Sequence, residues 1–230
     1  MCLKMSKKVE FLGFFWYNIT HMIITKHGES FLKFVYADKT IAFNPISKNS
    51  KQKTTKFGSD IAISCLYHPD FNGYDQVSYK DKVPFTIKGA GEYEISDVFI
   101  KGYGLKQKFQ KADEMITSYS ILFDEINLVV IGPISKAEDF SNEAYEEFNK
   151  GDIFIVPIGG EETFTPKEAA KFVKQFSPKV VIPIFYSSKD QLKEFSAELG
   201  SELKTEEKLT IKKKDLPEEG KKELIELKTI

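Results

Sequence analysis

The residues best suited to chemistry lie in one short stretch, where Pro69 separates His68 from Asp70. A neutral imidazole and a carboxylate are ligand types that zinc binds in proteins, and either could also act as a general base. The chain has three histidines, His21, His27 and His68, which excludes a histidine-rich metal centre. Two interpretations are open for His68 and Asp70: residual ligands and a general base of a one-metal hydrolase, or loop residues that hydrogen-bond to the backbone.

Cys65 precedes His68 by three residues and invites a second chemical interpretation. An imidazole can activate a nearby thiol as a nucleophile. A small cysteine buried at the end of a strand is the commoner arrangement, and we favour it here. The chain's two cysteines, Cys2 and Cys65, lie far apart in the sequence, which is typical of a reducing compartment and predicts a cytoplasmic location.

The composition describes an ordinary globular chain. Its 230 residues are 41% hydrophobic and 29% charged, enough to form the core of one large α/β domain. The formal net charge is -1 and the sequence contains no arginine, so we expect no nucleic-acid partner. We also expect no membrane partner, because the apolar run at residues 11–17 is far too short to span a bilayer.

The first twenty-one residues differ in character from the rest of the chain. No cleavage-site pattern comes after the apolar run, and a strand-like pattern begins at Met22, which could itself be an initiator. We therefore expect residues 1–21 to be an N-terminal extension or a mis-called start, and residues 22–230 to form the domain.

The apolar pattern predicts many strands and a few helices. Short β-rich runs come first and predict a mostly antiparallel sheet, at residues 31–36, 40–43, 61–65, 84–87 and 92–101. Further strands are expected at residues 116–123, 127–131, 153–157 and 180–184, with two more in the tail at 208–212 and 223–228. Capping boxes begin two helices, at Thr165 with Glu168 and at Ser188 with Gln191, and a weaker helix is expected at 142–149. This order favours an α/β or α+β fold.

Several of these segments, taken in order, resemble the metallo-β-lactamase superfamily. The resemblance runs from about residue 22 to the C-terminus, and within the superfamily it is greatest to bacterial zinc-dependent hydrolases similar to L-ascorbate 6-phosphate lactonases. It implies a four-layer αββα sandwich with a metal site where loops meet along one edge. The matching segments are residues 27–30, 41–45, 59–64 with 67–70, 89–94, 98–102, 153–160, 180–186 and 209–219.

The resemblance also implies a set of metal ligands, and this chain departs from it. Members of the family bind zinc through a His-x-His-x-Asp-His loop, a later His, an Asp and a final His. Matched to this pattern, the loop keeps His68 and Asp70, whereas the remaining positions fall on Leu66, Phe71 and Phe185 and near Gln107 and Pro133. Two further positions nearby also depart from the family, with Asn44 in place of Asp and Glu29 in place of His.

These departures lead to two hypotheses about function. The leading one is a member of the family that has lost its zinc site and hydrolytic activity, needs no cofactor, and acts by binding a protein partner or a second copy of itself. The alternative is a residual one-metal hydrolase of a lactone, ester or phosphoester, with zinc on His68, Asp70 and an unidentified carboxylate. Whether Leu66, Phe71 and Phe185 pack into a closed plug or form an exposed patch should help to distinguish them.

Overall fold

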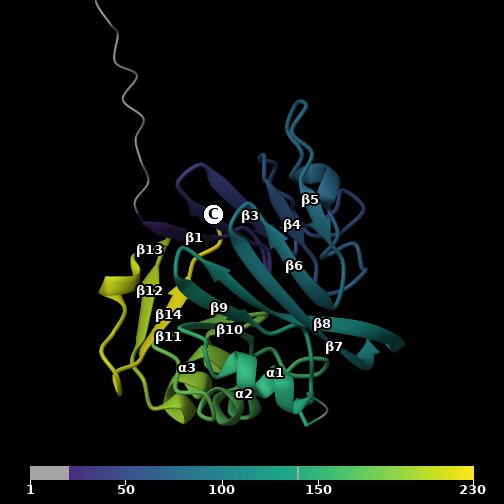
Figure 1. Ribbon diagram of the computed structural model, residues 1–230. Coiled ribbons are helices and arrows are strands. Elements are labelled where there is room, and N and C mark those ends of the chain that lie inside the picture. The colour runs from purple at the N-terminus through teal and green to yellow at the C-terminus, as the bar shows by residue number, and fades with distance from the viewer. Residues whose placement is uncertain (1–20, 139) are drawn as a thin grey trace, which may run out of the picture.

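Two β-sheets packed face to face form the centre of the molecule (Figure 1). The computed structural model describes residues 21–138 and 140–230. The first sheet has the order β13-β1-β2-β3-β4-β5, and the second has the order β12-β14-β11-β10-β9-β8-β7-β6. The expected α/β class and the sandwich of two sheets are confirmed.

In the first sheet, neighbouring strands are antiparallel from β13 through β1 and β2 to β3, and parallel from β3 through β4 to β5. The expected antiparallel pairing is therefore present in the β13 to β3 half of the sheet and absent from the other half. Their bounds are β1 (Met22–Lys26), β2 (Leu32–Tyr36), β3 (Lys39–Phe43), β4 (Ile61–Ile63), β5 (Phe85–Ile87) and β13 (Leu209–Ile211).

Alternating residues of β3 and β4 give the first sheet two buried faces. Ile41 and Phe43 point into the main core between the sheets, whereas Ala42 points to the opposite face. There it joins Ala62 in a second, smaller core that also contains Phe31, Ile46 and Val77. Residues 44–84 supply much of this outer layer as loops, with one turn of 3-10 helix, η1 (Tyr74–Gln76).

The second sheet is buried on both faces at its centre, because β9, β10 and β11 are almost entirely apolar. The helices α1 (Asn142–Phe148), α2 (Pro166–Val173) and α3 (Lys189–Leu199) lie together on the side away from β1 to β5 (Figure 1). The strands are β6 (Gly91–Ile95), β7 (Val98–Phe109), β8 (Ala112–Phe123), β9 (Ile126–Val130), β10 (Ile153–Pro157), β11 (Val180–Ile184), β12 (Leu203–Glu206) and β14 (Glu223–Leu227).

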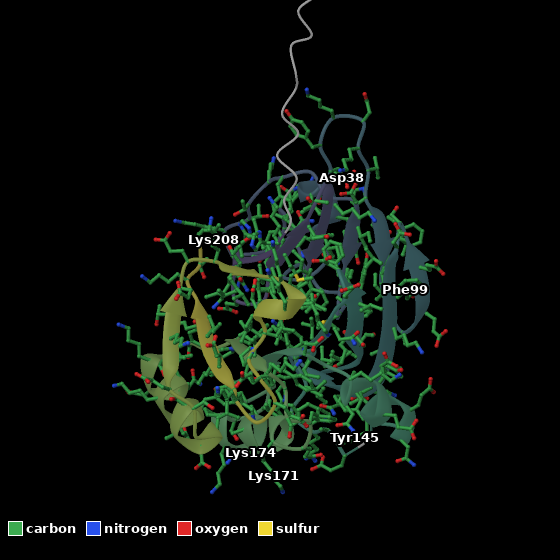
Figure 2. All side chains as sticks on the ribbon, turned by 60° about the vertical axis from the view of Figure 1, so that its left-hand side comes forward. Asp38, Phe99, Tyr145, Lys171, Lys174 and Lys208 are labelled. Atoms are coloured by element: carbon green, nitrogen blue, oxygen red, sulfur yellow. The ribbon has the colours of Figure 1, made fainter. Side chains whose placement is uncertain are left out.

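The helix boundaries agree with the predicted capping residues. Thr165 and Ser188 both form complete capping boxes, and α3 ends at Gly200, whose φ of 74° is the left-handed conformation that glycine adopts without strain. One side of α2 packs against the sheet, while Lys171 and Lys174 point away from it into solvent (Figure 2).

The prediction of a single strand at residues 92–101 was wrong. The chain turns back at Ser96 and Asp97, which have φ values of 50° and 63°, so this stretch forms the hairpin of β6 and β7. Positive φ at both central residues is the geometry of a tight hairpin turn, which usually carries Asn-Gly or Asp-Gly. Strand β12 was also missed, since residues 203–206 are mostly exposed and lack an apolar alternation.

Two further expectations concern the N-terminal extension and the membrane. Most of the expected N-terminal extension, residues 1–20, lies outside the described residues, and β1 begins at Met22. No helix among the described residues is both long and apolar enough to cross a membrane.

Candidate functional site

Three of the positions at which the resemblance places metal ligands, those of His68, Phe71 and Phe185, lie together, and their rings are in contact. The rings of Phe71 and Phe185 stack with centroids 5.9 Å apart, and Phe109 meets Phe71 edge-on at 5.6 Å. Phe71 is fully buried, and Leu66 from the same loop is 2% exposed. We call Leu66, Phe71, Phe109 and Phe185 the apolar plug. It is closed rather than an exposed patch, although Phe185 keeps part of its surface accessible.

The loop after β4 is held in place by buried hydrogen bonds. Asn44 is buried with φ of 51°, and its Oδ1 accepts a hydrogen bond of 2.8 Å from the backbone N–H of Cys65. The hydroxyl of Tyr119 donates to the carbonyl oxygen of Ser64 at 2.8 Å, and the Ser64 hydroxyl donates to the carbonyl of Phe71. These contacts fix the path of residues 64–71 and direct Phe71 inward.

Cys65 is a buried cysteine just beyond the end of β4, which is the arrangement that we favoured. It is 1% exposed, and burial raises the pKa of its thiol. A buried, protonated thiol is a poor nucleophile.

Phe185, just beyond the end of β11, contributes its ring to the plug from the side opposite the loop that carries Phe71. Phe185 has φ of 57°, an uncommon conformation for a bulky residue. Its backbone N–H donates to the carbonyl of Glu29 at 3.1 Å, and its own carbonyl lies so close to Gly159 that a Cβ there would stand 2.2 Å away. Glycine at position 159 therefore allows the close approach that seats the Phe185 ring over Phe71.

His68 and Asp70 lie together at the rim of the plug, as the sequence suggested, but their polar atoms are already engaged. The backbone N–H of Asp70 donates to His68 Nδ1 at 3.3 Å, and His68 Nε2 lies 3.1 Å from Oε1 of Gln110. These contacts fit a neutral imidazole that carries its hydrogen on Nε2. The Asp70 carboxylate accepts a hydrogen bond from the Ser50 hydroxyl, and its other oxygen lies 3.6 Å from His68 Nδ1.

Gln107 and Pro133 mark two further positions of the expected ligand set, and the Gln107 side chain is bonded to the loop that follows Pro133. From β7 its Oε1 accepts hydrogen bonds from the backbone N–H groups of Ser135, at 3.0 Å, and Lys136, at 3.4 Å, while its Nε2 donates to the Lys136 carbonyl. The loop after Pro133 is thus tied to β7 by an amide side chain. Sequence reasoning missed this bridge, and it also missed Phe109 and Gln110, because their positions depend on the register of the β7 and β8 hairpin.

An open groove of about 390 Å³ lies over the plug. Aromatic rings line it, together with four carboxylates, those of Glu29, Asp70, Glu161 and Glu162. The described residues that line it include no lysine, although lysine supplies every one of the chain's 33 basic residues. The groove therefore presents negative charge next to the rings of Phe109, Phe185 and Tyr186, which favours a cationic group.

The residues present do not fit the zinc centre that the fold family implies. A structural or catalytic zinc needs three or four protein ligands, and the hydrocarbon side chains of the plug supply none. Among residues 21–138 and 140–230, no group of three or more His, Cys, Asp or Glu side chains could hold a metal ion. Two side chains, His68 and Asp70, offer donor atoms at the expected positions, and both are hydrogen-bonded to protein.

Comparison with known proteins agrees with the fold. Residues 23–185 match the family model described as a beta-lactamase superfamily domain. A 72-residue stretch is 35% identical to a metal-dependent hydrolase from Thermococcus onnurineus (strain NA1), covering 30% of this chain and 31% of that relative, so the match spans less than a third of its length.

Two solved structures are similar over much of the chain. A candidate Zn-dependent hydrolase of the metallo-beta-lactamase superfamily from Thermotoga maritima has a TM-score of 0.67 at 22% identity, covering 90% of this chain and 98% of that one. A metallo hydrolase from Ignicoccus hospitalis has a TM-score of 0.53 at 18% identity, with coverages of 79% and 91%. Because the family model spans more than half of the sequence and the fold agrees, the chain belongs to the metallo-β-lactamase superfamily.

Proposed function

We propose that this chain is a non-hydrolytic binding protein built on the metallo-β-lactamase fold. The observation that carries the proposal is the apolar plug, which places Leu66, Phe71 and Phe185 where the resemblance calls for three histidines. A leucine or phenylalanine side chain offers a metal no lone pair, so it cannot help to hold a metal ion that would activate a water.

The groove over the plug is where we expect the partner to bind. Its carboxylates and aromatic rings suit a lysine or arginine side chain, so the proposed partner is a protein that presents a basic segment. The carboxylates of exposed Glu161 and half-buried Glu162 would attract such a segment to the groove, with a strong dependence on salt concentration.

The first experiment measures zinc by elemental analysis in the full chain, purified without chelators or affinity metals, next to His68→Ala. We expect zinc well below one equivalent in both proteins. Near-stoichiometric zinc in the wild type that is lost in His68→Ala would overturn the proposal. Light scattering on the same sample would show whether a second copy of the chain is the partner.

The second experiment tests the groove by charge reversal. A short lysine-rich peptide serves as the probe, and binding is measured by calorimetry for the wild type and for the double variant Glu161→Lys with Glu162→Lys. The matched control reverses a second pair of adjacent glutamates, Glu218 and Glu219, which are exposed and do not line the groove. The proposal requires that the groove variant lose binding while the control keeps it; equal losses would point to general charge attraction.

A second candidate function is the one-metal hydrolase, and the similarity to proteins named metal-dependent hydrolases favours it. In this alternative His68, Asp70 and an unidentified carboxylate would hold zinc, and the metal would activate a water for hydrolysis. The substrates to test are a lactone, an ester and a phosphoester, the lactone because of the resemblance to ascorbate-phosphate lactonases. Hydrolysis that needs added zinc and disappears in Asp70→Asn would establish it in place of the binding protein.

A further inference from the structure

A second cavity, of about 600 Å³, contains the side chain of Lys26. It lies between the end of β1 and the last residues of the chain, and it adjoins the groove, since Glu29 and Tyr186 line both. Lys26 is 5% exposed, an unusual burial for a lysine. Nothing in the proposed function uses this residue.

The ammonium group of Lys26 has a ring contact in place of an ion pair. Its Nζ lies 4.3 Å from the centroid of the Tyr186 ring, and within the described part of the chain it has no hydrogen bond and no carboxylate within ion-pair distance. The nearby carboxylate of Glu226 is already occupied, because Tyr186 donates to one oxygen at 3.1 Å and Thr205 donates to the other at 2.8 Å.

The backbone holds Lys26 firmly at this place. Lys26 pairs with Leu32 of β2, and its carbonyl accepts a 3.0 Å hydrogen bond from the backbone N–H of Ile230. Figure 1 shows the C-terminus beside β1, in agreement with the bridge between Lys26 and Thr229. The backbone of Lys26 is therefore fixed at the wall of the cavity, and its side chain is buried against Tyr186, unlike that of a surface lysine.

We propose that Lys26 is a reactive amine that forms an imine with small aldehydes entering this cavity. The neutral amine attacks the carbonyl carbon to form a carbinolamine, which loses one water and leaves a carbon–nitrogen double bond. The ammonium form first gives one proton to solvent or to a carboxylate. Protonation of the imine restores a positive charge at the same nitrogen, where the Tyr186 face and the nearby glutamates stabilise it.

The electrostatics of the cavity support this chemistry. Burial lowers the pKa of Lys26 to about 8, although Glu226 and Glu29 oppose the shift. At pH 7.5 the neutral fraction is then on the order of a hundred times that of a lysine with the ordinary pKa of about 10.4. The other titratable groups that line the cavity are His27, Lys53, Tyr186 and Lys228.

The test treats the full chain with acetaldehyde at pH 7.5, reduces any imine with borohydride and maps the modified lysines by mass spectrometry. Lys33 is the matched control, because its Nζ also lies over a ring, 4.6 Å from the centroid of Phe57, but outside the cavity. We expect Lys26 to be modified at least about 10-fold faster than Lys33 and than exposed lysines such as Lys193, with a rate midpoint near pH 8.

Lys26→Arg keeps the positive charge and should abolish the adduct while leaving the fold intact by circular dichroism. The comparison of Lys26 with Lys33 uses the wild type alone, so it stands even if the variant does not fold. Modification of Lys26 at or below the rate of Lys33 would overturn the inference.

Discussion

The rings of Phe71 and Phe185 lie parallel within 7°, with their centroids 5.9 Å apart, although the two residues come from opposite sides of the candidate site. Offset stacking at this distance adds to the free energy gained by burying the rings. The contact joins the loop after β4 to the end of β11, two segments that a shared metal ion would link in the zinc enzymes of this fold. Packing thus provides a connection that metal coordination would otherwise supply.

Removal of the Phe71 ring should therefore destabilise the whole domain. We expect Phe71→Ala to lower the free energy of unfolding by about 3–5 kcal/mol, measured by urea denaturation, because the ring is fully buried and leaves a cavity. Phe99 on β7 is the control, since it is 46% exposed and points outward (Figure 2), and its alanine variant should cost less than about 1 kcal/mol. Equal losses in the two variants would contradict a packed plug.

Gln107 should protect the loop that it holds. In Gln107→Leu the backbone N–H groups of Ser135 and Lys136 lose their acceptor, and we expect both amides to exchange with solvent about 10-fold faster, as for a loss near 1.4 kcal/mol. Gln107→Glu still offers acceptor oxygens and should retain most of the protection. Unchanged exchange in Gln107→Leu would mean that the side chain does not restrain the loop.

Asn44 combines a hydrogen bond with a left-handed backbone, and two variants separate these contributions. Asn44→Gly loses the bond to the N–H of Cys65 but keeps the favoured backbone, at a cost of about 1–2 kcal/mol. Asn44→Ala loses the bond and also strains the backbone, so it should cost about 1 kcal/mol more. Thermal and urea unfolding measure both, and an alanine variant as stable as the glycine variant would refute the backbone contribution.

His27 should make stability depend on pH. Burial, assisted by the nearby charge of Lys33, lowers its pKa from 6.5 to about 4. Because the unfolded chain binds the proton more readily, the stabilisation is complete above about pH 6.5 and is lost as the pH falls toward 4. Allowing for its partial exposure, we expect about 1–2 kcal/mol between pH 7 and pH 5, and this part should vanish in His27→Gln. Parallel pH profiles for the two proteins would disprove it.

Much of the fold could be predicted from the sequence where one local signal dominates. The uninterrupted apolar runs of β10 and β11 and the capping boxes of α2 and α3 identify these elements without tertiary information. The turn at Ser96 and Asp97 could not be predicted, because neither residue is the glycine that usually marks positive φ.

In the candidate site, too, some features could be predicted from the sequence and others could not. The replacement of histidines by Leu66, Phe71 and Phe185 is visible in the sequence once the family resemblance is recognised. The hydrogen bond between His68 and Gln110 is not, because it joins residues 42 positions apart through the end of the β7 and β8 hairpin. Long-range pairing of this kind leaves no local pattern.

The pairing of β1 with β13 affects the order in which the domain can form. Met22 and Ile211 are direct partners across the first sheet, and Lys26 bridges to Thr229, so the earliest described strand depends on residues that are translated about 200 positions later. While the ribosome is still adding the later strands, β1 can pair with β2, and β2 with β3, but β1 has an open edge on its other side. Closure of that edge requires contacts between distant parts of the chain, which form slowly, so nascent chains should remain exposed to misassembly until β13 has been synthesised.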